Sequence, residues 1–182
     1  MVDKTPGIRP RRSWGQRLDR AARRGFPAGT TICGMILLTA PFGVPGQAQL
    51  LPAFTLAAVF FWTLFRPASV PPPLVFVIGL FADLLGEMPI GSNVLVLLLT
   101  QLLVVRSRRH LPLKGFLFVW LVFIAVAAVA ATLQWALACL MDWTIYPPIA
   151  GIAQFLLAAG LYPLLAMGFT QAHRTIAAPE RV

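Results

Sequence analysis

Long apolar stretches alternate along the chain with short polar or proline-rich breaks. Crossing the hydrocarbon core of a membrane takes about 20 apolar residues at roughly 1.5 Å of rise each. Six stretches approach that length, and they cover residues 27–46, 49–65, 70–87, 91–105, 114–140 and 146–170. The fourth is short and the third begins with three prolines, so we expect these two to be tilted, broken or sheltered by neighbours. The pattern predicts an all-α, polytopic membrane protein with six transmembrane helices in one bundle.

Composition and charge agree with a membrane location. Of the 182 residues, 58% are hydrophobic and only 12% are charged, too few to keep so much apolar surface soluble. With six helices and both termini cytoplasmic, all fifteen Lys and Arg residues fall on the cytoplasmic side, as the positive-inside rule requires. Glu87 and Asp142 fall on the outer side. No nucleic-acid-binding motif is visible, so topology and anionic lipid account for the net charge of +9.

The chain divides into a basic leader, a membrane domain and a tail. Residues 1–25 hold eight basic side chains, and the segment SWGQRLDRAARRGF starts with Ser13 and Gln16 at capping-box spacing. This predicts a short interfacial helix on the anionic cytoplasmic leaflet, and a flexible tail is the alternative. Residues 26–172 form the six-helix domain, and residues 173–182 form a cytoplasmic tail.

A secretory signal peptide is the alternative for the first apolar stretch. Residues 31–45 resemble an apolar h-region, and small residues follow at 46–48. The prolines at 41 and 45 and the long basic leader favour an uncleaved helix. Cleavage after Ala48 would leave the topology downstream unchanged.

The segment FADLLGEMPIGSN at residues 81–93 carries two of the six acidic residues, Asp83 and Glu87, one helical turn apart. An intramembrane carboxylate is costly and usually faces the bundle interior with a partner, so Asp83 is a functional candidate. Gln134 and Gln154 fall in the same outer half of the bilayer, which predicts an intramembrane polar layer. In the structural alternative, Asp83 is hydrated or accepts hydrogen bonds from a neighbouring helix end. Proton or ion coupling would require further ionisable groups, and the inner halves of the predicted helices contain none.

Several small residues shape the predicted loops and helix contacts. Gly86, Pro89 and Gly91 break the helices at the outer turn, and Ser92 or Asn93 can cap the helix that follows. Glycines at 34, 79, 151 and 160 would permit close helix approach.

Motifs of the common enzyme classes are missing. His110 and His173 both fall at cytoplasmic helix ends, so the paired histidines of a zinc-protease helix are not available. The sequence has no G-x-S-x-G elbow and no Gly-rich phosphate-binding loop. We therefore expect no catalysis, no metal site and no cofactor.

Taken in order, these pieces resemble the rod shape-determining protein MreD family over about residues 50 to 175. The resemblance rests on Arg66-Pro67 closing a helix, on PPPLVFVIGLFADLLGEMPIGSNVLVLLL, on the RSRRHL junction, and on LQWALA and LYPLLA. The chain departs from the family in its long basic N-terminus and in Glu87-Met88, where small residues are more usual.

The resemblance implies a non-catalytic inner-membrane scaffold of the bacterial cell-elongation machinery, which builds sidewall peptidoglycan. It also implies an architecture similar to the substrate-binding subunits of energy-coupling-factor transporters. The implied direct partner is the bitopic protein MreC, and through it MreB filaments, a SEDS-family glycosyltransferase and a penicillin-binding transpeptidase.

The partner is expected to dock its transmembrane segment in a groove lined by small residues. The candidate contacts on the outer turn are Asp83, Gly86, Glu87, Pro89 and Gly91. A cytoplasmic basic junction, expected to face lipid headgroups or cytoplasmic partners, comprises Arg106, Arg108, Arg109 and Lys114. The alternative function is a membrane-embedded substrate-binding or transport subunit for a small molecule, with the polar layer as its site.

Overall fold

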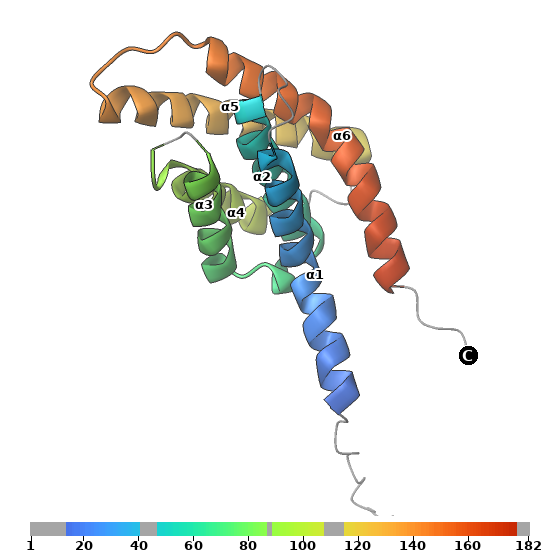
Figure 1. Cartoon of the computed structure of the whole chain (residues 1–182). Helices are drawn as coiled ribbons and strands as arrows, with labels where there is room; N and C mark the ends of the chain where they lie inside the picture. The colour runs from blue at the N-terminus through green and yellow to red at the C-terminus, as the bar shows by residue number, and fades with distance from the viewer. Residues whose placement is uncertain (1–13, 41–46, 87–88, 108–114, 178–182) are drawn as a thin grey trace, which may run out of the picture.

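The fold is all-helical in the part of the chain that the structure, a computed structural model, describes: residues 14–40, 47–86, 89–107 and 115–177. The all-α prediction is confirmed for these residues. The elements are α1 (Trp14–Thr39), α2 (Gln47–Phe65), the short 3-10 turn η1 (Pro67–Ser69), α3 (Pro72–Leu85), α4 (Ser92–Ser107), α5 (Phe116–Met141) and α6 (Ile149–Ala177), as Figure 1 shows.

Three of the described helices are long and apolar enough to cross a membrane. They contribute Ala48–Phe65 in α2, Phe116–Met141 in α5 and Ile149–Thr170 in α6. The apolar part of α1, Gly25–Thr39, and the helices α3 and α4 are shorter. With 14 and 16 residues, α3 and α4 reach roughly 21 and 24 Å, less than the hydrocarbon thickness of about 30 Å. Three such helices are typical of a membrane protein.

The two ends of the chain differ from the expected division. Helix α1 runs without a break from Trp14 to Thr39, so residues 14–25 are helical and continue into the first apolar stretch. Alanine and arginine are good helix formers, and the helix continues through Pro27, which lies inside it. Helix α6 likewise continues to Ala177, past the expected start of the tail at residue 173. Residues 1–13 and 178–182 lie outside the described part.

Helix α2 forms the centre of the molecule. Every residue from 51 to 64 is buried, and α2 contacts each of the five other α-helices. A helix that is apolar on all sides has to be covered on all sides. Phe60 shows how the cover is made, because its ring centroid lies 5.1 Å from that of Phe123 on α5 and 5.6 Å from that of Tyr162 on α6.

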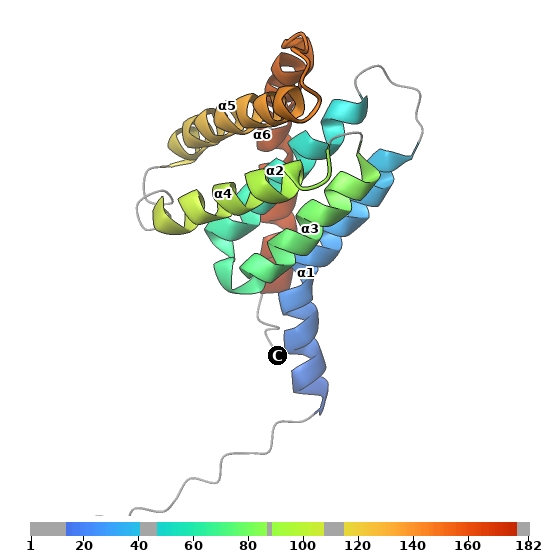
Figure 2. The same cartoon turned by 90° about the vertical axis from the view of Figure 1, so that its left-hand side faces the viewer.

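The arrangement of the other helices is visible in two views. Figure 2 shows α1, α2 and α3 side by side, and each pair of these helices is in contact. In Figures 1 and 2, the start of α1, the η1 turn and the end of α6 lie toward one end of the molecule. The end of α3 and the turn from α5 to α6 lie toward the opposite end.

The three consecutive prolines do not break α3. Pro71 precedes the helix with extended dihedral angles, and Pro72 and Pro73 occupy its first turn. The backbone N–H groups of a first helical turn have no intrahelical partner, so proline loses nothing at these positions. The prolines therefore fix where a regular helix begins.

Close helix approach was expected at four glycines, and the structure distinguishes among them. A Cβ atom on Gly79 of α3 would lie 2.7 Å from the Cα atom of Val94 on α4. One on Gly34 would collide with a phenylalanine ring on α2. At Gly151 the nearest atoms would be 3.8 Å away, and at Gly160 nothing lies within 4 Å. The expectation therefore holds at Gly34 and Gly79 and is wrong at Gly160, which has open space beside it.

Replacing Gly79 by Ala is expected to destabilise the α3–α4 pair, because the new methyl group meets backbone atoms that cannot rotate away. Overpacking costs typically about 1–3 kcal/mol. The matched control is Gly160→Ala, which gains helix propensity of up to about 1 kcal/mol without a clash. Thermal unfolding in detergent should show a lower midpoint for Gly79→Ala and an equal or higher one for Gly160→Ala. Equal midpoints for both variants would contradict the close packing.

Candidate functional site

Asp83 lies near the end of α3 on the face that packs against α4. The buried residues of α3 are Val75, Ile78, Gly79, Ala82 and Asp83, a helical spacing that places them on one side. Asp83 is only 3% exposed. The same face therefore buries four apolar or small residues and one carboxylate.

The Asp83 carboxylate accepts three hydrogen bonds from the start of α4. Its Oδ2 accepts from the backbone N–H of Gly91 at 2.8 Å, and its Oδ1 accepts from the backbone N–H and the side-chain Nδ2 of Asn93, both at 3.0 Å. The first N–H groups of a helix have no partner within it, and the helix dipole favours a negative charge there. Asp83 thus caps α4 from a neighbouring helix, which is the arrangement of the structural alternative considered for it.

The turn between α3 and α4 is shaped to bring these donors to Asp83. Gly91 has a φ of +98°, a left-handed conformation that favours glycine. The carbonyl oxygen of Pro89 accepts from the backbone N–H of Ser92 at 3.1 Å and from its hydroxyl at 2.8 Å. Gly86 ends α3 by donating its N–H to the carbonyl of Ala82 at 2.9 Å. Glu87, the other acidic residue predicted at this turn, lies outside the described residues.

The hydrogen bonds continue from Asn93 across two further helices. Asn93 Oδ1 accepts from Gln134 Nε2 on α5 at 2.7 Å, and Gln134 Oε1 accepts from Gln154 Nε2 on α6. Asn93, Gln134 and Gln154 are each 3% exposed, the same as Asp83. We call these four residues the polar chain. It links α3, α4, α5 and α6 at the end of the molecule where α3 ends.

Comparisons with known proteins add no further assignment. No protein-family model, curated protein or solved structure matches this chain.

The structure brings together the three residues predicted to form a polar layer and adds one that was missed. Asp83, Gln134 and Gln154 do not all contact one another directly, because Asn93 connects the carboxylate to the glutamines. Sequence analysis assigned Asn93 only as a possible helix cap. The available signal was its place beside Ser92 at the start of an apolar helix, directly across a short turn from Asp83.

The polar chain is occupied by its own internal hydrogen bonds. Both oxygens of Asp83 accept N–H groups, so this carboxylate is held in place and is not presented to a cavity as a base or nucleophile. Among the described residues, no three His, Cys, Asp or Glu side chains lie close enough to hold a metal ion. The hydrogen bonds of the polar chain fix the positions of four helices relative to one another.

The basic junction is described only at its first residue. Arg106 lies in the last turn of α4 and is exposed, where a cation interacts favourably with the helix dipole. Arg108, Arg109 and Lys114 lie outside the described residues.

The turn between α5 and α6 is held by side chains of α5. Trp135 Nε1 donates to the carbonyl oxygen of Tyr146 at 2.9 Å, and the backbone N–H of Tyr146 donates to Cys139 Sγ at 3.4 Å. The Tyr146 hydroxyl donates to Asp142 Oδ2 at 3.1 Å, and this hydrogen bond to the carboxylate raises the pKa of Tyr146 above its ordinary value of 10.0. The phenol therefore stays protonated and keeps donating at neutral pH.

Beside this turn, a groove of about 340 Å³ lies between α5 and α6. We call it the α5–α6 groove. Four of its lining residues are small, and four are larger. The lining consists of Ala128, Ala131, Thr132, Trp135, Pro148, Gly151, Ile152 and Phe155.

Replacing Asp83 by Asn is expected to lower stability by about 1–3 kcal/mol, because an amide NH₂ would face backbone donors and leave at least one of them unpaired. Hydrogen exchange at the amides of Gly91 and Asn93 should become faster in the variant. The control is Asp142→Asn at the exposed α5–α6 turn, where the amide oxygen can still accept the Tyr146 hydroxyl, so we expect a change of about 0.5 kcal/mol or less. Unchanged exchange at both amides would show that the carboxylate does not cap α4.

The pair Gln134 and Gln154 offers a separate test of the polar chain. Gln134→Leu leaves both Asn93 Oδ1 and Gln154 Nε2 without partners, so we expect a loss of about 1–3 kcal/mol. Adding Gln154→Leu removes one orphaned group and should recover part of that loss. A double-mutant cycle on thermal unfolding measures the coupling, expected at about 0.5–3 kcal/mol. Strictly additive effects would mean that the two amides are not coupled.

Proposed function

We propose that this chain is a non-catalytic scaffold of the bacterial cell-elongation machinery in the inner membrane, and that it docks the single transmembrane helix of MreC. The observation that carries the proposal is the α5–α6 groove, whose small residues lie beside a turn fixed by hydrogen bonds. The assignment to cell elongation comes from the resemblance of the ordered sequence motifs to the MreD family. The architecture similar to energy-coupling-factor subunits is part of the same proposal.

The proposed topology has six passes with both termini in the cytoplasm. The start of α1 and the end of α6 lie toward the same end of the molecule, which supports placing both termini on one side (Figures 1 and 2). Helices α3 and α4 are short for a membrane, but they pack on each other and on α2. Their capped turn satisfies the polar groups that would otherwise meet lipid.

Helix docking in a membrane depends on close van der Waals contact, because lipid tails are as apolar as leucine side chains. Small side chains allow the backbones of two helices to approach. In the α5–α6 groove, Ala128, Ala131 and Thr132 of α5 lie opposite Gly151 of α6. This composition favours a packed helix over loosely held lipid.

The polar chain supports docking indirectly. Because Asp83 is buried, it cannot offer its carboxylate to a partner, but it fixes the turn that carries the exposed Ile90. Gln134 and Gln154 join α5 to α6 and so hold the two walls of the groove together. We therefore assign Asp83 a positioning role within the proposed partner-binding turn.

Further partners follow from the same proposal. Through MreC the chain would be linked to MreB filaments, a SEDS-family glycosyltransferase and a penicillin-binding transpeptidase. The basic leader would contact anionic lipid, and neither nucleic acid nor a cofactor is invoked. A small-molecule-binding subunit would need a polar site open to a ligand, whereas the amides and carboxylate of the polar chain bond to one another.

The experiment compares Gly151→Leu with Gly168→Leu, both on α6, in gentle purification from native membranes. The isobutyl side chain introduced by Gly151→Leu would fill the α5–α6 groove, whereas Gly168 has nothing within 4 Å and lies outside it. We expect Gly151→Leu to reduce recovered MreC at least about tenfold, a free-energy change of about 1.4 kcal/mol, and Gly168→Leu to leave it unchanged.

Mass spectrometry of the co-purified proteins separates the remaining outcomes. Equal recovery of MreC with both variants would reject the groove as its docking site. Absence of MreC from the wild-type preparation would reject the scaffold function itself. Recovery of an ATPase and a coupling membrane protein would assign the chain to transport.

A further inference from the structure

A second groove lies between α4 and α5 and differs from the α5–α6 groove in its lining. Its volume is about 350 Å³, and eight of its ten lining residues are apolar. Most of these are leucine or valine, so large side chains would hold the backbone of an incoming helix away. We call it the α4–α5 groove. A thin, flexible hydrocarbon chain suits such a surface better than a helix does.

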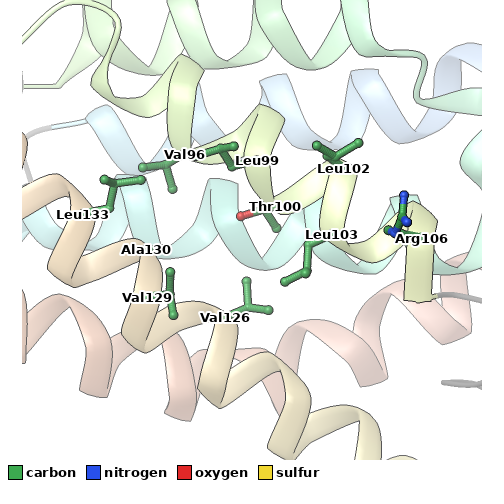
Figure 3. Close-up of a pocket in the computed structure, with 10 residues that line it drawn as sticks. All are labelled: Val96, Leu99, Thr100, Leu102, Leu103, Arg106, Val126, Val129, Ala130 and Leu133. Carbon is green, nitrogen blue, oxygen red and sulfur yellow. The ribbon is translucent and has the colours of Figure 1, made fainter.

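One end of the α4–α5 groove carries a cation. Figure 3 shows Arg106 at one end of the row of lining side chains and Leu133 at the other. Arg106 is exposed in the last turn of α4, so its guanidinium is available to an outside group. Guanidinium groups bind phosphate oxygens through charge-assisted, often bidentate hydrogen bonds.

The length of the α4–α5 groove fits one membrane leaflet. Val96 and Arg106 lie ten residues apart on α4, which corresponds to about 15 Å along the helix. Half of a hydrocarbon core of about 30 Å is also about 15 Å. A lipid whose phosphate contacts Arg106 would therefore extend its acyl chain along the whole groove, past Leu103 and Val129, to the level of Val96 and Leu133.

We propose that the α4–α5 groove binds one anionic phospholipid, with an acyl chain between the two helices and the headgroup phosphate on Arg106. The bound lipid completes the contact between α4 and α5, whose side chains leave this space open. The site is separate from the α5–α6 groove and does not depend on the proposed partner. It requires only that the helix end carrying Arg106 lie at the level of the headgroups.

Native mass spectrometry of the purified full chain tests the proposal, with phosphatidylglycerol and phosphatidylcholine of identical acyl chains as probes. We expect the wild type to bind one phosphatidylglycerol about five- to tenfold more tightly than phosphatidylcholine, because one Arg contributes that much to anionic-lipid binding. Arg106→Gln should abolish this preference, and Arg106→Lys should retain part of it. An unchanged preference in Arg106→Gln would overturn the headgroup assignment.

A second pair of variants tests the acyl chain. Val129→Trp places an indole in the α4–α5 groove, and Leu164→Trp is its control, because Val129 and Leu164 are 66% and 67% exposed but only Val129 lines the groove. Val129→Trp should weaken binding of both lipids, and Leu164→Trp should change neither. Equal lipid binding by the two variants would overturn the proposal. So would loss of a co-purifying protein from Val129→Trp with lipid binding intact, which would show that the groove holds a protein helix.

Discussion

Four polar side chains buried among apolar helices satisfy one another, and this set of hydrogen bonds organises one end of the molecule. An unpaired buried amide or carboxylate costs several kcal/mol in an apolar medium, so Asp83, Asn93, Gln134 and Gln154 are stable only when their four helices are together. Apolar packing alone is tolerant of small shifts between helices. Hydrogen bonds are sensitive to distance and angle, so the polar chain sets the relative positions of α3, α4, α5 and α6.

Helix α2 holds the other helices together by apolar packing. It contacts every other α-helix through an apolar surface, but the polar chain does not pass through it. The centre of the fold is thus held by packing, and hydrogen bonds hold the end of the molecule where α3 ends. The walls of the α5–α6 groove are fixed by both, since α6 packs along α2 and Gln154 bonds to α5. The α4–α5 groove lies where neither kind of contact closes the space between helices.

Helix positions could be predicted from this sequence more readily than side-chain partners. Long apolar runs and their breaks located the starts and ends of α2 to α5 to within about two residues. The continuation of α1 through the leader was missed because a charged, alanine-rich segment forms a helix equally well whether it is a separate helix or the start of a longer one. Asn93 was missed as a link because its partners are 10 and 41 residues away along the chain. Gly79 and Gly160 look alike in sequence, and only the neighbouring helix distinguishes them.

The capped turn between α3 and α4 has a consequence for how the chain enters a bilayer. Neither helix is long enough to be recognised as a stable span by itself, and α4 exposes unpaired N–H groups when it is alone. The bonds from Asp83 to Gly91 and Asn93 close within ten residues of chain, so they can form as soon as both helices have been synthesised. In the proposed six-pass topology the α3–α4 hairpin would therefore insert as one unit, with the Asp83 carboxylate and the first N–H groups of α4 already hydrogen-bonded to each other.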